Sequence, residues 1–373
     1  MYLVKKVAVG ISGGVDSAVA ALLLKEQGYD VVAVHLYCWP PKSEIEKDGL
    51  TREEWIKKNG CRADEDRTFA LKTALELEIP FTVLDFSEEY NQKVITYFYD
   101  EYEAGRTPNP DVMCNSEIKF GLFLNWALEN GFDYIATGHY AKNVCNESCK
   151  LMIPTDKHKD QTYFLWKLTQ KELAHTLFPL GEYSKNEVRE MAEKANLSVA
   201  KRKDSQGICF VGNVEAREFL ARRLKENPGK VLDIHGEEIG KHDGVWFYTI
   251  GQRGGWEILP SAQRKFAGKG VTPVFYVVSK DAKKNILTVA LENEAGGDQF
   301  QVGEINRISK TKWNLDHLIV RIRHGGELIG ARGMETEEGL PVILDKSIRG
   351  IASGQSAVFY SEEGECLGGG VID

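Results

Sequence analysis

The first half of this chain of 373 residues alternates between short apolar runs rich in β-branched residues and longer stretches with apolar side chains at helical spacing. The runs predict strands, and the stretches between them predict helices. Strands separated by helices need right-handed crossovers, so we expect an α/β unit whose mostly parallel sheet is covered on both faces. A polar span, 40–60, interrupts the rhythm and is interpreted as an insertion. The expected strands are 4–11, 30–37, 81–86 and 132–137, and the expected helices are 15–27, 67–77, 116–130, 159–177 and 184–195.

The character of the sequence changes after about residue 212. A short helix is predicted over 214–224, and a glycine-rich mixed region follows it. From about residue 275 onward, short β-branched runs are separated by turn residues, which is typical of a small antiparallel barrel. These runs are 274–279, 286–291, 318–322 and 357–360. The expected units are therefore 1–212, 213–283 and 284–373.

The motif between the first expected strand and the first expected helix is rich in glycine and hydroxyl groups. It reads Gly10-Ile11-Ser12-Gly13-Gly14-Val15-Asp16-Ser17. Glycines let the backbone approach a ligand closely, and the N–H groups of the turn then face it with the positive end of a helix behind them. Hydroxyls at positions 12 and 17 add donors, and the carboxylate at position 16 is placed to hold a metal that neutralises a polyphosphate. The motif predicts a phosphate site.

Three other interpretations of this turn are less favoured. A Walker-A loop ends in Gly-Lys-[Ser/Thr], and the chain has no lysine between Lys6 and Lys25. Residues 10–14 formally satisfy the G-x-S-x-G nucleophile elbow of a hydrolase, which also needs an acid and a late histidine. His317 and His324 lie in the strand-rich C-terminal region, so a hydrolase is kept as a minor alternative. A plain strand–turn–helix connection, which needs no such set of phosphate ligands, is favoured least.

The formal net charge is −8, which excludes a uniformly basic nucleic-acid coat protein but allows local basic strips. Lys and Arg outnumber Asp and Glu by eight to four over 200–230 and by five to one over 305–323. No stretch approaches the roughly 18 apolar residues of a membrane span. The N-terminus resembles neither a secretory signal nor a transit peptide, so we expect a cytoplasmic protein without a membrane partner.

Seven cysteines are scattered along the chain without the rhythm of a disulfide framework, which fits a reducing compartment. Cys145 and Cys149 have C-x3-C spacing, for which structural or free thiols are favoured over zinc because no second pair accompanies them. We therefore expect no metal site made of protein side chains. No chemistry is assigned to Cys38, Cys61 or Cys366.

Two further cysteines lie in polar, turn-like contexts that favour chemistry over burial. Cys114 follows two prolines and directly precedes the expected helix 116–130, whose N-terminus would lower the pKa of the thiol. Asp111, three residues earlier, is placed either to serve as a base or to orient the reacting group. Cys209 lies near the basic triplet 201–203, and nearby cations favour the nucleophilic thiolate. The two thiols are far apart in sequence and can meet only through the fold.

Residues 12–17 resemble the signature of the PP-loop ATP pyrophosphatases, in which the loop binds the pyrophosphate of ATP. Further segments are similar to the bacterial tRNA-specific 2-thiouridylase family, in the right order and over almost the whole chain. They are residues 105–120, 136–141, 159–165, 204–210, 249–253, 354–360 and 366–372. The resemblance implies an α/β fold in which a PP-loop (adenine nucleotide alpha-hydrolase-like) parallel-sheet domain precedes a small mixed central domain and a C-terminal antiparallel β-barrel.

The resemblance also implies a reaction. In this family the C2 oxygen of the wobble uridine of tRNA is adenylated by ATP, and sulfur from a cysteine persulfide gives 2-thiouridine, AMP and pyrophosphate. The residue matching Cys209 carries the persulfide, the residue matching Cys114 completes the transfer, and Asp111 matches the proposed base. The two thiols can then close a transient disulfide. A stacked base is out of reach, so we expect the uridine to flip into a pocket near Cys114.

The same resemblance implies contacts residue by residue. Those expected to contact ATP are Gly10, Ile11, Ser12, Gly13, Gly14, Val15, Asp16, Ser17, Leu36 and Gly138. Those expected to contact the target base are Asn109, Pro110 and Asp111. Those expected to contact tRNA elsewhere are His139, Lys159, Asp160, Gln161, Arg323, His324 and Gln355. Residues 323 and 324 stand where the family commonly has arginine and tyrosine.

The implied cofactor is ATP with Mg²⁺, and persulfide sulfur is the implied co-substrate. The implied partners are the lysine, glutamate and glutamine tRNAs and a sulfur-donor protein, such as a cysteine desulfurase or a sulfur relay protein. A second class of enzyme stays open, a PP-loop amide-forming ligase that acts on a small molecule and uses the barrel for oligomerisation. The thiols discriminate the two, because a ligase needs neither Cys114 nor Cys209.

Overall fold

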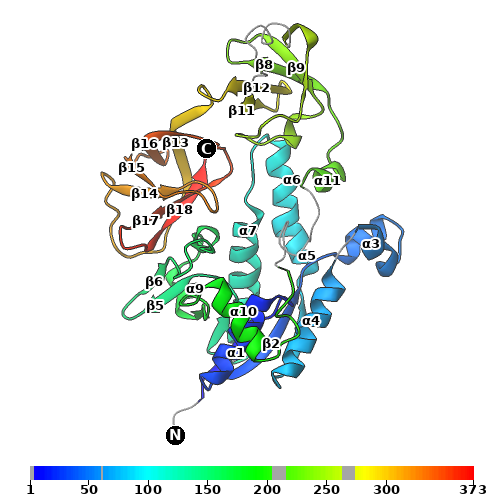
Figure 1. Cartoon of the computed structure of the whole chain (residues 1–373), viewed down its shortest axis with the longest axis vertical. Helices are drawn as coiled ribbons and strands as arrows, with labels where there is room; N and C mark the ends of the chain where they lie inside the picture. Colours follow the sequence, from blue (N-terminus) through cyan, green and yellow to red (C-terminus); the bar gives the residue numbers. More distant parts are fainter. Residues whose placement is uncertain (1–3, 60–61, 204–215, 263–273) are drawn as a thin grey trace.

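A parallel sheet forms the centre of the N-terminal unit (Figure 1). The computed structural model describes residues 4–59, 62–203, 216–262 and 274–373. Within them this sheet has five strands in the order β3-β2-β1-β4-β7, and all neighbouring pairs are parallel, as the alternation of strands and helices predicts. The strands are β1 (Lys6–Gly10), β2 (Asp30–Tyr37), β3 (Phe81–Asp85), β4 (Tyr134–Ala136) and β7 (Thr176–Leu177).

Helices cover both faces of this sheet, because successive side chains of a strand point to opposite sides. Val7 and Val9 of β1 pack in one buried cluster, whereas Ala8 between them packs in another. The first cluster receives side chains from α1 (Val15–Glu26), α4 (Ala63–Glu76) and α10 (Lys185–Lys194). The second receives them from α2 (Lys42–Lys47), α3 (Arg52–Asn59), α5 (Ser87–Tyr90), the π-helices η1 (Asn91–Ile95) and η2 (Cys114–Phe123), α6 (Thr96–Glu103), α7 (Pro110–Met113) and α8 (Leu124–Glu129).

The stretch 159–177 is not the single helix that its spacing predicts. It is divided into the 3₁₀ turn η3 (Thr162–Phe164), the short helix α9 (Gln170–Ala174) and strand β7. A capping box made by Thr169 and Glu172 begins α9 and separates it from the turn before it. The span 40–60, expected as an insertion, contains α2 and α3, so it folds onto the sheet unit rather than standing apart from it.

The middle unit is a mixed sheet with the strand order β10-β9-β8-β12-β11 in its described part. The runs 274–279 and 286–291 both have the pattern interpreted as a barrel, and the second also falls inside the expected barrel unit 284–373. Both belong to the middle sheet instead, because they form a hairpin whose strand β12 pairs in parallel with β8. A hairpin has the same sequence pattern whichever sheet it joins, so the pattern alone could not assign this hairpin to the middle sheet. The elements are α11 (Ala216–Ala221), β8 (Gly229–Asp233), β9 (Glu238–His242), η4 (Val245–Phe247), β10 (Glu257–Ile258), β11 (Phe275–Asp281) and β12 (Ile286–Leu291).

A closed antiparallel barrel forms the C-terminal unit, within the described range 274–373, as the sequence predicts (Figure 1). Its strands follow the order β13-β16-β15-β14-β17-β18 around a third buried cluster that includes Val320 and Phe359. The strands are β13 (Gly296–Arg307), β14 (Leu318–Arg321), β15 (Ile329–Gly333), β16 (Leu340–Arg349), β17 (Ser356–Tyr360) and β18 (Cys366–Ile372).

The barrel packs directly on the sheet unit. Trp166, which is buried, donates its indole N–H to Ser356 Oγ at 2.9 Å, and a Cβ at Gly369 would stand 3.0 Å from that indole. The hairpin of β5 (Lys142–Cys145) and β6 (Cys149–Met152) also reaches the barrel, through a bridge between Met152 and Glu365. In the described part of the chain, every helix is too short or too polar to cross a bilayer.

Candidate active site

The glycine-rich turn lies between β1 and α1, and short-range hydrogen bonds hold its hydroxyl groups. The backbone N–H of Ser12 donates to Ser17 Oγ at 3.1 Å, and the two side-chain oxygens are 3.2 Å apart. Gly13 has a φ of 82°, and a Cβ there would stand 2.4 Å from the carbonyl oxygen of Asp66 in α4. The turn therefore needs glycine at this position, both for its backbone conformation and for its packing against α4.

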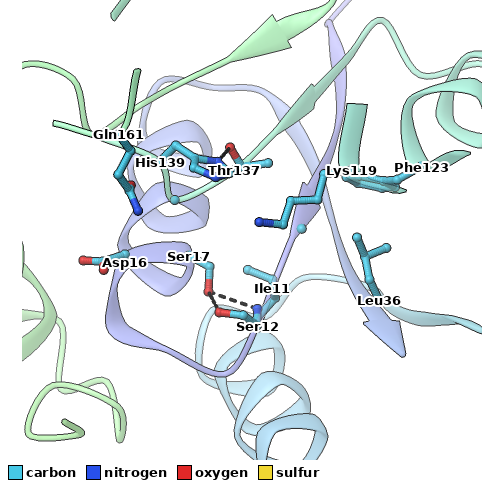
Figure 2. A pocket seen from close by; sticks show the side chains of 12 residues that line it. Ile11, Ser12, Asp16, Ser17, Leu36, Lys119, Phe123, Thr137, His139 and Gln161 are labelled. Carbon is cyan, nitrogen blue, oxygen red and sulfur yellow. Dashed lines mark hydrogen bonds between the residues drawn. The ribbon is translucent and has the colours of Figure 1, made fainter. Parts of the chain in front are cut away.

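A cavity opens between this turn, the end of β4 and helix η2 (Figure 2). Most of the residues expected to contact ATP line it. Gly13 and Gly14 of the turn and Val15 at the start of α1 do not. His139 and Gln161, which were expected to contact tRNA, line this same cavity. The described residues that line it are Gly10, Ile11, Ser12, Asp16, Ser17, Leu36, Lys119, Phe123, Thr137, Gly138, His139 and Gln161.

Gly138 brings the end of β4 against the start of α1. A Cβ at this residue would stand 2.6 Å from the backbone nitrogen of Ser17 and 2.8 Å from the carbonyl carbon of Asp16. Both are backbone atoms of the first helical turn, so they cannot swing aside as a flexible side chain would. Only glycine allows the strand end and the glycine-rich turn to form one wall of the cavity.

We expect Gly138→Ala to weaken ATP binding by at least about tenfold and to lower the free energy of unfolding by about 1–3 kcal/mol, because the added methyl displaces the first turn of α1. Equilibrium titration with ATP and urea denaturation measure the two effects. The matched control is Gly297→Ala, where the nearest atom would be 3.5 Å from the new Cβ. Unchanged ATP affinity in Gly138→Ala would show that this contact does not shape the nucleotide site.

Arg202, which lies near the end of the sheet unit in sequence, binds both the glycine-rich turn and α4. Its Nη1 donates to the carbonyl oxygen of Gly13 at 2.6 Å, its Nη2 pairs with Asp66 at 2.5 Å, and the guanidinium lies 4.3 Å from the centre of the Phe69 ring. The sequence interpretation placed this arginine in the basic triplet near Cys209. Cys209 lies outside the described residues, and the contacts observed for Arg202 are with the turn and α4.

Asp16, expected to hold a metal, has both carboxylate oxygens engaged by side chains. Lys185 Nζ lies 2.8 Å from Oδ1 and 2.9 Å from Oδ2, and the Tyr140 hydroxyl donates to Oδ1 at 2.9 Å. Lys185 is buried at the start of α10, where Ser184 and Glu187 form a capping box. Neither Lys185 nor Tyr140 was assigned to the site from sequence, because the lysine lies 169 residues from its carboxylate. Among the described residues, no group of three or more His, Cys, Asp or Glu is placed to hold a metal ion.

His139 is a buried and neutral member of the cavity wall. Its Nδ1 lies 2.7 Å from Thr137 Oγ1, and its ring packs near Phe120 and Phe178. Burial, with a smaller effect from the ammonium of Lys119, lowers the pKa of His139 well below its usual value. The histidine therefore lines the cavity as an uncharged hydrogen-bonding group at physiological pH.

The lowered pKa of His139 predicts a loss of stability in mild acid. The unfolded chain binds a proton at this histidine below about pH 6.5 while the folded chain does not, so folding is opposed as the pH falls. We compare the drop in the free energy of unfolding when the pH is lowered from 7.5 to 5.5. This drop should be about 1.4 kcal/mol smaller in His139→Gln than in the parent chain. Urea denaturation at the two pH values measures this difference, with the exposed His158 changed to Gln as the control. Equal losses in His139→Gln and the parent would contradict the burial argument.

Cys114 lies inside a helix rather than ahead of one. The helix begins at Pro110, with Asn109 as N-cap accepting a 3.4 Å hydrogen bond from the backbone N–H of Val112, because proline is favoured in the first helical turn. Cys114 is therefore the first residue of η2, about one turn beyond the helix N-terminus, and its side chain is fully buried. The expectation that this thiol stands at a helix N-terminus is corrected: that end carries Asn109 and the partly exposed Asp111.

The loop that leads to Cys114 is held by the barrel. Gln355 Nε2 donates to the carbonyl oxygens of Thr107 at 3.1 Å and Pro108 at 3.0 Å. The backbone N–H of Thr107 donates to Ser353 O, and a Cβ at Gly354 would stand 2.8 Å from Thr107 O. Gln355, expected to contact tRNA, thus uses its amide to anchor the loop that presents the expected base-contacting residues.

Asp160, also expected to contact tRNA, makes a buried ion pair with the barrel. Arg321 Nη1 lies 2.5 Å from Asp160 Oδ2, and the exposed fractions of the two side chains are 9% and 2%. The other carboxylate oxygen accepts hydrogen bonds from the backbone N–H and the hydroxyl of Thr162. The neighbouring Lys159 is only partly exposed. The segment that follows β6 is therefore fastened to β14 by charge.

Arg323 and His324 extend beyond the end of β14, and both are exposed. The His324 ring lies 4.4 Å from the ring of Phe164, and partial burial lowers the pKa of this histidine. Arg323 lines a groove between the barrel and the middle unit, together with residues 249–251 and Arg349. These two residues are the expected tRNA contacts that stay open to a large partner.

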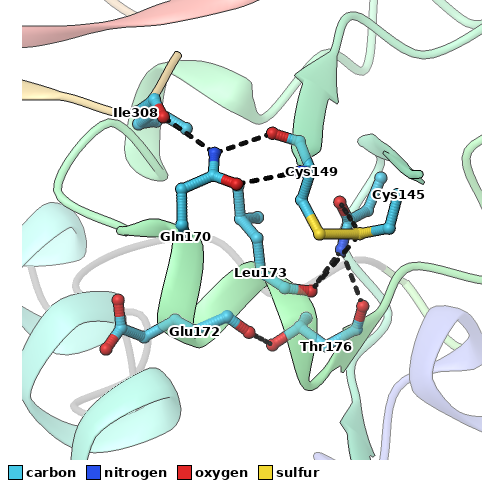
Figure 3. Close-up of a disulfide and its surroundings, with 8 residues drawn as sticks. Cys145, Cys149, Gln170, Glu172, Leu173, Thr176 and Ile308 are labelled. Carbon is cyan, nitrogen blue, oxygen red and sulfur yellow. Dashed lines mark hydrogen bonds between the residues drawn. A yellow bond between two sulfur atoms is a disulfide. The ribbon is translucent and has the colours of Figure 1, made fainter. Parts of the chain in front are cut away.

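Cys145 and Cys149 form a disulfide across the β5–β6 hairpin, where they are directly opposite each other (Figure 3). The sequence favoured structural or free thiols over zinc ligands for these two residues. In the structure they are bonded to each other as a disulfide and are not free. Gln170 holds both the backbone N–H and the carbonyl oxygen of Cys149. The disulfide expected from the resemblance, between Cys114 and Cys209, stays a prediction because Cys209 lies outside the described residues. Cys61 lies outside them too.

Three family profiles match the chain one after another. They are described as "tRNA methyl transferase HUP domain" over residues 5–213, "tRNA methyl transferase PRC-barrel domain" over 217–291, and "Aminomethyltransferase beta-barrel domain" over 298–372. The three ranges correspond to the parallel-sheet unit, the mixed-sheet unit and the closed barrel.

Curated relatives are similar to the chain over nearly its full length. A protein of Bacillus cytotoxicus named tRNA-specific 2-thiouridylase MnmA is 42% identical, and the alignment covers 99% of this chain and 94% of the relative. Proteins of the same name from Lactococcus lactis and Bacillus thuringiensis are 41% and 42% identical, with the same coverage.

Solved structures are less similar. A 4-thiouridine synthetase in complex with RNA and ATP has a TM-score of 0.35 at 17% identity, covering 57% of this chain and 46% of that one. An NMN synthetase from Francisella tularensis has a TM-score of 0.32 at 13% identity, covering 58% and 72%. Structural similarity this low says nothing about the site of this chain.

Proposed function

The chain belongs to the tRNA-specific 2-thiouridylase family, and from this premise we propose that it replaces the C2 oxygen of the wobble uridine of tRNA by sulfur while it cleaves ATP to AMP and pyrophosphate. Asp111 and Asn109 would contact the flipped base, Cys114 and Cys209 would transfer sulfur, and the glycine-rich turn would bind ATP.

One observation supports this proposal best: a single helix links the two halves of the chemistry. Helix η2 begins with Cys114, and its later residues Lys119 and Phe123 line the cavity beside the glycine-rich turn. A base adenylated in that cavity would therefore lie along the helix that carries a buried thiol. An amide-forming ligase has no use for a thiol at that place.

The proposed chemistry balances without a further cofactor. A carbonyl oxygen is a poor leaving group, so attack of the C2 oxygen on the α-phosphate of ATP first gives an adenylate and releases pyrophosphate. The terminal sulfur of a Cys209 persulfide then attacks C2, and AMP leaves with the oxygen. Cys114 next attacks Cys209 Sγ, which breaks the sulfur–sulfur bond, frees 2-thiouridine and closes the Cys114–Cys209 disulfide. A thiol reductant reopens that disulfide before the next turnover.

Mg²⁺ would enter with ATP. Among the described residues that line the cavity, Asp16 is the one carboxylate. A single carboxylate suits Mg²⁺, because phosphate oxygens and water supply the remaining ligands. When bound, the ion would neutralise charge on the phosphates. Asp16 would hold it after the ammonium of Lys185 moves off the carboxylate, and Tyr140 would keep the carboxylate oriented.

We further propose the lysine, glutamate and glutamine tRNAs as substrates, a cysteine desulfurase or sulfur relay protein as the sulfur donor, and the cytoplasm as the site of action. The exposed side chain of Arg323, on the barrel beside the middle unit, supports a contact with an anionic partner. A substrate held mainly through its phosphates is bound less tightly as salt rises.

The test is product analysis with the full chain, ATP, a persulfide source and tRNA with an unmodified wobble uridine. The expected products are AMP, pyrophosphate and 2-thiouridine. The matched control is a tRNA without uridine at the wobble position, which should yield none of them. Formation of ADP would contradict the adenylation step. AMP formation that needs a small amine or acid instead of tRNA would indicate the ligase.

A further inference from the structure

The ammonium of Lys119 is the charged group of the cavity that no expectation from sequence accounts for. We propose that Lys119 binds the α-phosphate, first in ATP and then in the adenylated tRNA, and stabilises the charge that develops on AMP as it leaves. The assignment rests on the proposed function and adds to it the residue that handles the reacting phosphate.

The position of Lys119 is the first support. It lies on η2 and is partly exposed, and Figure 2 shows its side chain extending from the helix into the cavity beside the turn. On the opposite side stand Ser17 and the end of β4. A phosphate seated on the N–H groups of the turn would therefore meet the ammonium across the cavity.

The charges around the cavity are the second support. Asp16 is directed away from Lys119 in Figure 2, and its carboxylate is already paired with Lys185. His139 is neutral, because burial and the ammonium of Lys119 itself lower its pKa. Among the described residues that line the cavity, Lys119 is the one lysine or arginine, and it points away from the one carboxylate, Asp16. An anion is the ligand chemistry that such a wall favours.

A neighbour on the same helix positions the ammonium. Lys119 Nζ donates to Asn115 Oδ1 at 2.9 Å, and Asn115 Nδ2 donates to the carbonyl oxygen of Phe164 at 3.1 Å. The second bond fixes which way the amide points, so its oxygen faces the lysine. Asn115 is itself buried. The ammonium is therefore held in place before any ligand arrives, which lowers the cost of orienting it during the reaction.

The helix also sets the distance between phosphate and thiol. Lys119 follows Cys114 by five residues in a π-helix, whose backbone bonds join residues five apart, so the two lie one helical turn apart. If the target base reaches Asn109 and Asp111 at the helix start, a phosphate held by Lys119 would lie about one turn further along the same helix. The same element would thus stabilise the leaving group and carry the thiol that completes the transfer.

Two variants test the assignment, with AMP formation, ATP affinity and tRNA affinity as readouts. We expect Lys119→Met to slow tRNA-dependent AMP formation by about 10²-fold, as loss of one preorganised charge at a reacting centre does. Lys119→Arg should recover part of the rate, because a guanidinium keeps the positive charge but has a different shape from the ammonium. The affinity for tRNA and the melting temperature should stay at the parent values. The matched control is Lys93→Met, which removes an exposed lysine paired with Glu117 of the same helix.

AMP formation by Lys119→Met at the parent rate overturns the assignment. So does a loss shared equally by Lys119→Met and Lys119→Arg with a lowered melting temperature, because that pattern marks a structural role through Asn115. Failure of the proposed function shows separately, as absence of AMP from the parent chain. In that case ATP affinity still decides: unchanged affinity in Lys119→Met overturns phosphate binding, and weakened affinity supports it.

Discussion

Cys114→Ser is expected to stop the release of 2-thiouridine by several orders of magnitude in a single turnover without added thiol, while pyrophosphate and AMP are still formed. In the proposed mechanism, adenylation takes place in the cavity of the glycine-rich turn and needs no thiol. Attack by the Cys209 persulfide still displaces AMP, but no second thiol then cleaves the sulfur–sulfur bond. The tRNA should remain attached to the protein through a disulfide, and gel analysis with and without a reductant measures this adduct.

The control for Cys114→Ser is Cys366→Ser. Cys366 is equally buried, and burial raises the pKa of its thiol, so it is a poor nucleophile. Both changes place a hydroxyl in an apolar setting and share that cost in stability. Only the change at Cys114 should trap tRNA. Free 2-thiouridine at the parent rate in Cys114→Ser would refute the role of this thiol.

Asp160→Asn is expected to lower the free energy of unfolding by about 3–5 kcal/mol, because it leaves the guanidinium of Arg321 buried without its counter-charge. The carboxylate and the guanidinium are both almost fully buried at the contact between the sheet unit and the barrel. Asparagine keeps the shape of the side chain, so the effect reports the charge rather than a cavity. Urea denaturation followed by tryptophan fluorescence measures it.

The matched control is Glu327→Gln, which removes the charge of a pair with Lys346 whose side chains are 59% and 54% exposed. A pair so exposed contributes at most about 1 kcal/mol. The two changes therefore separate a buried ion pair from an exposed one within the same barrel. If Asp160→Asn kept the parent stability and instead weakened tRNA binding, Asp160 would be a direct tRNA contact and not a fastening between units.

Local patterns predicted the parts of this protein that depend on local contacts. The alternation of strands and helices foretold the parallel sheet, because the order of elements along the chain dictates crossover connections. The glycine-rich turn foretold one wall of the cavity beside α1, and the other walls come from distant parts of the chain. The same approach was wrong where a short polar contact interrupts a pattern. The capping box at Thr169 and Glu172 divides the expected helix 159–177, and the N-cap at Asn109 starts the helix of Cys114 before its expected beginning.

Long-range contacts decided which polar groups of the expected site residues are used within the fold. Arg202 reaches the carbonyl oxygen of Gly13 across 189 residues of sequence, and Gln355 reaches Thr107 across 248. Nothing in a local pattern reports such pairs. Gln355 and Asp160 resembled tRNA contacts in sequence, and in the fold their polar groups are used between the barrel and the sheet unit.

The sequence by itself determined the fold class, the family and the place of the glycine-rich turn, because these depend on residue periodicity and on motifs of a few neighbouring residues. Only the tertiary structure decided the charge of the cavity, where Lys185 pairs with Asp16 and Lys119 extends into the cavity. The physical reason is that the field at a site is the sum over all groups that the fold brings near it. Residues far apart in the chain contribute to that sum as strongly as neighbours do.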